Sequence, residues 1–131
     1  MPILLRLLSL LIAISAQSLN SVQAKEAHRI ISLAPHLTEM VYSAGAGDKL
    51  VGVVNYSDYP QDAKKKPIIG SYNAINIERI IELQPDLILS WRSGNRLQDY
   101  ERLHSLQKKL GFTLFESEIN INNSFKFYII L

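Results

Sequence analysis

A regular alternation between short apolar runs and amphipathic segments is the strongest limit on what this chain can fold into. The apolar runs are rich in β-branched residues, as expected of strands that are buried on both faces. They occupy residues 29–33, 50–54, 68–70, 87–91 and 112–115. Segments with apolar residues at helical spacing lie between them, at residues 38–44, 76–84 and 96–110. Strands joined through helices predict an α/β fold, with an open, mostly parallel sheet and flanking helices.

Particular residues predict where these helices begin and end. Thr38 and Asn76 carry side-chain oxygens that can accept from unpaired backbone N–H groups, so we expect them to cap the first and second helices. Gly45 and Gly111 follow the first and third helices, and glycine readily adopts the left-handed conformation that ends a helix. Pro85 stops the second helix, because a proline disfavours helical conformation at the residue before it.

The second and third helices each have one apolar side, which we expect to pack against the sheet. In the second helix this side consists of Ile77, Ile80, Ile81 and Leu83. In the third helix it consists of Leu97, Tyr100, Leu103, Leu106 and Leu110. The remaining positions of both helices are largely charged or polar, and we expect them to face solvent.

Residues 1–24 have the layout of a secretory signal. Arg6 is the only charged residue before Lys25, the stretch 7–16 is almost wholly apolar, and Ala24 provides a small residue for cleavage. The apolar stretch is much shorter than the roughly 20 residues that a membrane-spanning helix needs. A buried N-terminal helix is the alternative, but a core helix would carry polar residues along one side. We therefore expect export, with cleavage near Ala24.

Composition excludes several classes of function. The 131 residues suffice for one domain, and a net charge of +2 is too small for a nucleic-acid-binding surface. The absence of Cys excludes disulfide scaffolds, thiolate metal sites and cysteine nucleophiles. The chain has no Gly-x-Ser-x-Gly motif, and its three His residues lack the spacing of metal ligands. We predict a protein that is not an enzyme and holds no metal, with a small exported α/β enzyme as the alternative.

Several predicted strands are followed by an aromatic residue. Pro35 and His36 come after the first strand, Tyr56 after the second and Tyr72 after the third, and Trp91 ends the fourth. The carboxyl ends of parallel strands meet at one edge of a sheet, where ligands bind in open α/β folds. Rings gathered there could stack on a large planar ligand, or they could simply cover the sheet edge. The spacing leaves both interpretations open, and it leaves His36 as either a loop residue or a contact to a ligand or a haem iron.

A series of motifs extends along residues 29–118. They are Arg-Ile-Ile-Ser-Leu-Ala-Pro at 29–35, Tyr-Ser-Asp-Tyr-Pro at 56–60, Asn-x-Glu-Arg-Ile at 76–80, Gln-Pro-Asp-Leu-Ile at 84–88 and Trp-Arg-x-Gly-Asn at 91–95. This series resembles periplasmic binding proteins of the helical-backbone type, which feed ABC importers of cobalamin, haem and iron–siderophores. The motifs at 56–60 and 91–95 together are most similar to the cobalamin-binding branch of that family.

The resemblance implies a fold and a role. Residues 25–118 would be the N-terminal, Rossmann-like lobe of a two-lobed protein that holds its ligand between the lobes. The location would be periplasmic, and the transported ligand would be cobalamin or a related corrinoid, with no cofactor. The partners would be the permease and ATPase of an ABC importer at the inner membrane, with no nucleic acid.

The resemblance also implies which residues form the sites. Tyr56 and Trp91 would line the cobalamin cleft, and Tyr72 stands where the family usually has Trp. With Pro35 and His36 they make up the expected substrate-binding residues. Glu78 matches a surface carboxylate that pairs with arginines of the permease; without the resemblance it would be an ordinary first-turn glutamate, favoured by the helix dipole.

The end of the chain departs from the family pattern. Residues 119–131 resemble nothing in the family, and only the first of its two lobes is present. We expect a truncated or frame-shifted copy, with a native single-lobe protein or a non-functional gene remnant as the alternatives. A haem or iron–siderophore carrier is the alternative to a cobalamin carrier.

Overall fold

The computed structural model describes residue 3 and residues 25–118. The expected signal segment, apart from residue 3, and the expected tail lie outside the described residues. The strands are β1 (Ile30–Ser32), β2 (Leu50–Val53), β3 (Gly70–Ser71), β4 (Ala74–Ile75), β5 (Leu87–Trp91) and β6 (Thr113–Ser117). The helices are α2 (Pro35–Ser43), α3 (Ile77–Glu82) and α4 (Leu97–Leu110), with short 3₁₀ helices η1 (Gly47–Lys49) and η2 (Gln61–Lys65).

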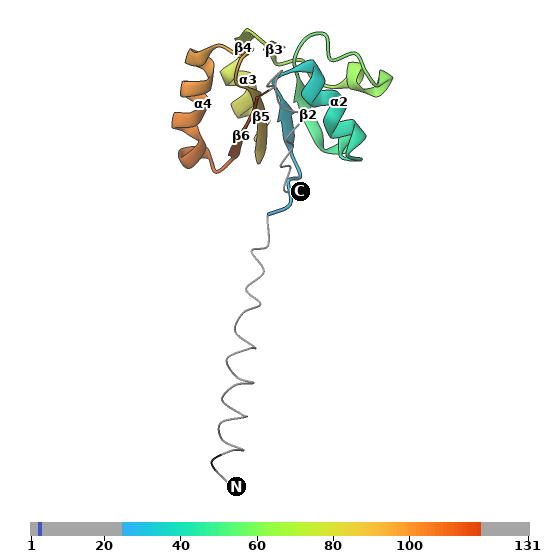
Figure 1. Cartoon of the computed structure of the whole chain (residues 1–131). Coiled ribbons are helices and arrows are strands. Elements are labelled where there is room, and N and C mark those ends of the chain that lie inside the picture. The colour runs from blue at the N-terminus through green and yellow to red at the C-terminus, as the bar shows by residue number, and fades with distance from the viewer. Residues whose placement is uncertain (1–2, 4–24, 119–131) are drawn as a thin grey trace.

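Four of these strands form one sheet in the order β2-β1-β5-β6, and each neighbouring pair is parallel. Figure 1 shows α3 and α4 on one side of this sheet and α2 on the other. The predicted α/β fold with a parallel sheet and flanking helices is confirmed. Because all four strands run in the same direction, their carboxyl ends share one edge of the sheet, the edge near β3 and β4 in Figure 1.

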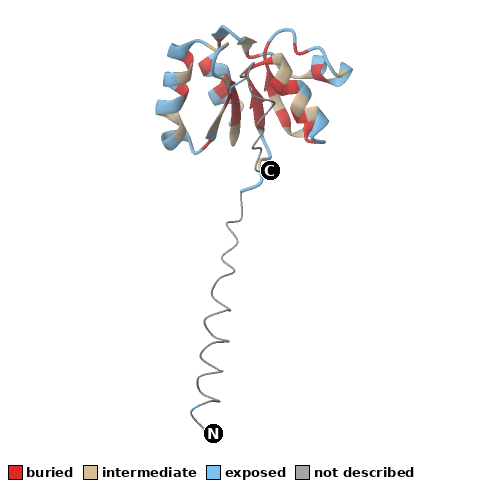
Figure 2. Ribbon diagram, in the orientation of Figure 1, coloured by how far each residue is buried: buried red, intermediate tan, exposed pale blue. Residues whose placement is uncertain are grey.

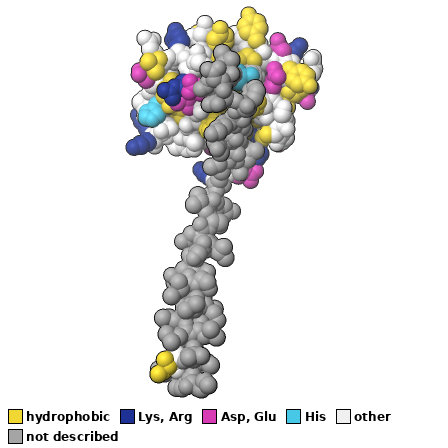
Figure 3. Space-filling view, viewed as in Figure 1, with side chains coloured by type: hydrophobic (Ala, Val, Ile, Leu, Met, Phe, Trp, Pro, Cys, Tyr) yellow, Lys and Arg dark blue, Asp and Glu magenta, His cyan; other side chains and the backbone are white. Residues whose placement is uncertain are grey.

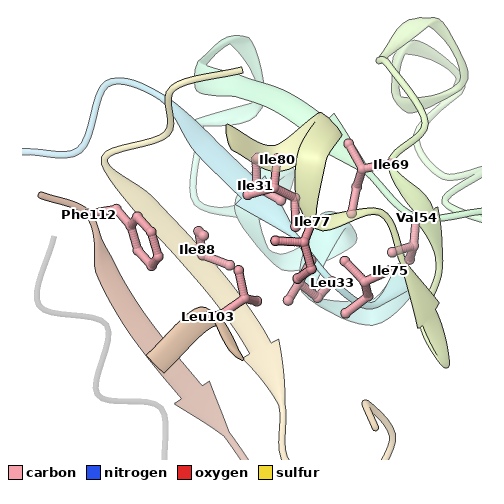
Figure 4. Packing of buried hydrophobic residues seen from close by; sticks show 10 residues of the cluster. All are labelled: Ile31, Leu33, Val54, Ile69, Ile75, Ile77, Ile80, Ile88, Leu103 and Phe112. Carbon is pink, nitrogen blue, oxygen red and sulfur yellow. The ribbon is translucent and has the colours of Figure 1, made fainter. Parts of the chain in front are cut away.

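Successive residues of the central strands enter two separate cores, because side chains along a strand alternate between its faces. Ile31 and Ile88 belong to the core under α3 and α4, where Figure 4 shows them packed with residues such as Leu103. Ile30 and Leu89 belong to the core under α2. In Figure 2 the buried residues accordingly fill the strands, while the outer sides of the helices are exposed. Covered on both faces, these strands appear in the sequence as continuous apolar runs.

The prediction that residues 68–70 form a strand of the main sheet was wrong. Ile68 forms only an isolated parallel bridge with Val53. At Gly70 the backbone takes a positive φ of 121°, and the nearby Ala74 carbonyl leaves no room for a side chain. The chain therefore turns away from β2, and β3 pairs with β4 in a separate antiparallel ribbon.

The first helix begins earlier than predicted. Pro35 and His36 form its first turn and do not lie in a loop. Proline is favoured at the first helical position because its missing N–H would be unpaired there in any case. The predicted Thr38 cap was wrong, since the N-cap residue is Ala34, which makes no side-chain capping bond. Thr38 lies buried inside α2 and donates to Ser32 Oγ at 2.9 Å.

Two other predicted helix ends are confirmed. Asn76 caps α3, and its Oδ1 accepts from the backbone N–H of Arg79 at 2.9 Å. Gly111 ends α4 in the left-handed conformation, with a φ of 77°. Both positions depend only on neighbouring backbone groups, which is why the sequence predicts them correctly.

The predicted apolar sides of α3 and α4 are only partly buried. Ile77 and Leu103 are buried as expected, whereas Ile81, Leu97 and Leu110 are 39%, 68% and 42% exposed. The 14 residues of α4 span about 21 Å, but the five-residue strand β5 spans only about 17 Å. The ends of α4 therefore extend past the sheet, and apolar residues there have nothing to pack against.

Asp86 joins the start of β1 to the start of β5. Its two carboxylate oxygens accept from the backbone N–H groups of His28 and Arg29, both at 2.9 Å. The Arg29 guanidinium donates in turn to the carbonyl of Leu83, with Nη2 at 2.6 Å. The bonds to His28 and Arg29 explain why an aspartate stands directly before the apolar run of β5.

Candidate ligand-binding site

Three of the expected site residues meet at the carboxyl edge of the sheet. His36 comes from the first turn of α2, Tyr72 from the turn between β3 and β4, and Trp91 from the end of β5. The ring centroids of His36 and Trp91 are 5.1 Å apart with an edge-to-face geometry, and those of Tyr72 and Trp91 are 5.8 Å apart. These distances are typical of interacting aromatic rings. We call His36, Tyr72 and Trp91 the aromatic wall.

The other two expected substrate-binding residues are not part of the aromatic wall. Pro35 is half-buried and precedes His36 at the start of α2. Tyr56 is 78% exposed in the loop after β2, and within the described part of the chain no ring contact joins it to the wall. Its backbone has a positive φ of 66°, which is uncommon for a residue other than glycine.

Buried hydroxyl groups hold the loop that carries Tyr56. Ser57 is only 4% exposed, and its Oγ shares a hydrogen bond with Thr38 Oγ1 at 3.2 Å. Thr38 also contacts Ser32 at the end of β1, so this chain of hydroxyls links α2, β1 and the loop. The loop therefore keeps its unusual turn at Tyr56 while exposing the tyrosine ring.

Trp91 is confined by its own loop. Gly94 packs so closely on the indole that a methyl group at this position would overlap the ring. The backbone N–H groups of Gly94 and Asn95 donate to the Trp91 carbonyl, at 3.2 and 2.8 Å. Glycine is needed at position 94 because the backbone itself contacts the face of the tryptophan.

His36 is half-buried and packs edge-to-face against the Trp91 ring. Its Nε2 is buried and has no hydrogen-bond partner in the described part of the chain. Burial lowers the pKa of His36 below its ordinary value, and the nearby Glu39 carboxylate opposes this shift. The neutral imidazole is therefore the favoured form beside Trp91.

Asn95 connects the segments around the aromatic wall, although the sequence pattern alone assigned it no role. Its Oδ1 accepts from the Trp91 backbone N–H at 2.6 Å, and its Nδ2 donates to the carbonyls of Leu33 and Tyr72 at 2.9 and 2.7 Å. The only signal in the sequence is its place in the motif at 91–95, directly after a strand that ends in Trp.

Glu78 lies apart from the aromatic wall, in the first turn of α3. It is exposed, and it accepts from Arg102 Nη2 of α4 at 2.9 Å. The sequence did not indicate this partner, because Arg102 lies 24 residues further along the chain. Exposed ion pairs of this kind contribute little to stability, so Glu78 is free to exchange partners.

Other kinds of site find no support among the described residues. No group of three His, Asp or Glu side chains there could hold a metal ion. Within the same residues, no helix is both long and apolar enough to cross a membrane. On the face shown in Figure 3, Lys and Arg lie interspersed with Asp and Glu and form no continuous basic area. The aromatic wall is therefore the best-formed candidate site, and it suits a ligand with a large flat surface.

Comparisons with known proteins agree with this fold and site. Residues 30–117 match the family described as periplasmic binding protein. The vitamin B12-binding protein of Vibrio vulnificus is 48% identical over 98 residues, which are 75% of this chain and 34% of that protein. The vitamin B12-binding protein of Yersinia pestis is also 48% identical, over 77% of this chain and 35% of that protein.

Solved structures give the same result. The periplasmic vitamin B12 binding protein of Vibrio cholerae has a TM-score of 0.62 and 49% identity, over 70% of this chain and 34% of that one. A periplasmic heme binding protein from Pseudomonas aeruginosa has a TM-score of 0.63 with 25% identity, over 71% of this chain and 32% of that one. This chain thus spans about a third of the length of the relatives that it matches. By sequence and by fold, the chain belongs to the periplasmic binding protein family.

Proposed function

We propose that this chain binds cobalamin in the periplasm and delivers it to the permease and ATPase of an ABC importer. The observation that carries the proposal is the convergence of Tyr72 and Trp91, with His36 behind the indole, at the carboxyl edge of a parallel sheet. Its support also includes family membership and the vitamin B12-binding relatives at 48% identity.

The aromatic wall suits a corrin ring for a physical reason. A corrinoid is broad and flat, so an aromatic ring that lies against it buries a large apolar area in one contact. Tyr72 is 39% exposed, so much of its side chain is accessible to a ligand in the absence of one. Tyr56, exposed beside the wall, is proposed as a further contact at its rim.

The described residues supply one wall, and this limits the affinity that they can reach. A ligand on a single wall keeps its other face in water, yet it loses nearly the same translational and rotational freedom as a fully enclosed ligand. We therefore expect the purified protein to bind cyanocobalamin with a Kd no tighter than about 1 μM, measured by isothermal titration calorimetry.

The same titration tests where the ligand binds. We expect Trp91→Ala to weaken binding by at least about tenfold, because it removes the centre of the wall. Leu110→Ala is the control, since Leu110 is an exposed apolar residue at the opposite end of the sheet, just before β6. A nanomolar Kd for the monomer would contradict the one-wall interpretation, and equal losses in the two variants would contradict the site.

Haem is the second candidate ligand, favoured by the structural likeness to a periplasmic heme binding protein and by the position of His36 at the wall. Adding haem to the same protein distinguishes between haem and cobalamin as the ligand. If cyanocobalamin does not bind but haem does, with an absorption spectrum that changes in His36→Ala, the ligand is haem and cobalamin is excluded.

A further inference from the structure

The side-chain amide of Asn95 contacts all three chain segments that surround the aromatic wall. It bonds to the end of β5 through the Trp91 N–H, to the segment after β1 through the Leu33 carbonyl, and to the β3–β4 turn through the Tyr72 carbonyl. Leu33 and Tyr72 are 62 and 23 positions away from Asn95 in the sequence. No other side-chain hydrogen bonds in the described part of the chain join these three segments through one group.

The chemistry of these three bonds requires an amide. One partner is a backbone donor and two are backbone acceptors, so the central group must accept on one atom and donate twice from another. Asparagine satisfies this pattern completely and without charge. A carboxylate of the same shape would keep the bond to Trp91, but it would place negative charge against two carbonyl oxygens.

The base of the β3–β4 ribbon is held by the Asn55 N–H, which donates to the Gly70 carbonyl at 2.8 Å, and by Ile75, which packs in the core; Asn95 holds its turn. The two strands of the ribbon have only two residues each, and an isolated two-stranded ribbon is marginally stable in water. The bond from Asn95 to the Tyr72 carbonyl fastens the turn to the main sheet at the residue that carries the wall's tyrosine. Asn95 therefore holds the backbone of the turn at the residue whose ring packs against Trp91.

We propose that Asn95 is a positioning residue, whose amide sets the relative placement of Tyr72 and Trp91 and so builds the aromatic wall before a ligand arrives. The part of this proposal that concerns the ligand rests on the proposed function above. The part that concerns the wall does not, because it can be tested on the protein alone.

Trp91 is the only tryptophan of the chain, so its fluorescence reports on the wall directly. In Asn95→Asp we expect the emission to shift to longer wavelength and acrylamide quenching to increase, because the displaced turn exposes the indole to water. The matched control is Asn73→Asp, which makes the same change in the same turn, where Asn73 accepts from Ser71 Oγ and from no other side chain among the described residues. We expect the control to match the unchanged protein in both measurements.

Circular dichroism and thermal melting first establish that each variant is folded at the temperature of the fluorescence measurement. If Asn95→Asp does not fold, Asn95→Ala replaces it, since it removes the three bonds without adding charge. Unchanged Trp91 emission and quenching in a folded Asn95 variant would overturn the proposal. Failure of both variants to fold would also overturn it, because Asn95 would then serve the whole fold and not the wall.

Cyanocobalamin titration then tests the part of the proposal that concerns ligand binding. We expect at least tenfold weaker binding in the folded Asn95 variant and no change in Asn73→Asp. If the unchanged protein binds no cyanocobalamin, the proposed function fails, while the fluorescence result still decides the role of Asn95. If it binds and the Asn95 variant binds equally well, the positioning role fails, while the proposed function stands.

Discussion

At the scale of single residues, the aromatic wall combines apolar faces with polar groups that are held away from solvent. The Trp91 indole Nε1 and the His36 imidazole Nε2 are both buried without a hydrogen-bond partner in the described residues. Unpaired buried polar atoms are rare because each costs free energy. Both unpaired atoms belong to rings of the aromatic wall, so the arrangement of these rings is kept at a cost in folding free energy.

Protonation of His36 is expected to weaken the fold. Burial lowers the pKa of His36 in the folded protein, so between its unfolded value near 6.5 and its lower folded value the unfolded chain binds more protons. The free energy of unfolding must therefore decrease as pH falls through this window. Thermal melts from about pH 7.5 to about pH 5 should show a larger loss for the unchanged protein than for His36→Gln.

Two features make this pH experiment specific. Glu39, the carboxylate that acts on His36, opposes the shift and so reduces the effect without reversing it. His104 is exposed on α4, and His104→Gln is the matched control, which should lose as much stability as the unchanged protein. Equal losses in His36→Gln and His104→Gln would show that His36 does not carry the pH dependence.

At the scale of elements, α4 shows that apolar spacing and burial are different properties. Leu97 and Leu103 both lie on its predicted apolar side, but Leu103 is 1% exposed and Leu97 is 68% exposed. Leu103 packs with Ile88 and Phe112 in the core that Figure 4 shows. Leu97 is the first residue of the helix, beyond the part that the sheet supports.

The two leucines provide a matched pair of substitutions. We expect Leu103→Ala to lower the free energy of unfolding by about 2–5 kcal/mol, because it removes buried methyl groups and leaves a cavity. Leu97→Ala should change it by less than about 0.5 kcal/mol. Urea denaturation followed by circular dichroism measures both values, and similar losses would contradict the packing of α4 described above.

At the scale of the whole molecule, two surfaces with different chemistry lie near one end of the sheet. The aromatic wall stands at the carboxyl edge, and α3, which begins directly after β4, presents Glu78 outward on one side. We propose that Glu78 docks on an arginine of the permease, with Arg102 as its partner in the free protein. The exposed pair is easily exchanged, because water already screens both charges.

Charge reversal tests this docking role. We expect Glu78→Arg to weaken association with the purified cobalamin permease complex in lipid nanodiscs by at least about tenfold, measured by surface plasmon resonance. The control is Glu82→Arg, because Glu82 is also exposed on α3 and pairs with Arg79. Equal weakening in both variants would indicate a general charge effect, and no weakening in Glu78→Arg would exclude docking through this residue.

Features that depend on neighbours along the chain can be predicted from the order of the amino acids. Apolar periodicity predicted the four strands of the main sheet and the three helices, because it reports which side of an element meets a core. The Asn76 cap and the Gly111 terminus were equally predictable, since their partners lie within a few residues. His36 and Trp91 could be placed at one edge because β1 and β5 are parallel and end there, whereas Tyr72 reaches that edge in the turn of the β3–β4 ribbon.

How those residues meet depends on contacts between segments that are distant in the sequence. The predicted Thr38 cap is wrong because the partners of its hydroxyl, Ser32 and Ser57, belong to other elements and hold it in a buried hydroxyl chain. The wall unites His36, Tyr72 and Trp91 but leaves Tyr56 outside their ring contacts. The Asn95 amide donates to the carbonyls of Leu33 and Tyr72, which lie 62 and 23 positions away in the sequence. A local pattern carries no information on such bonds, because they exist only once distant segments have packed together.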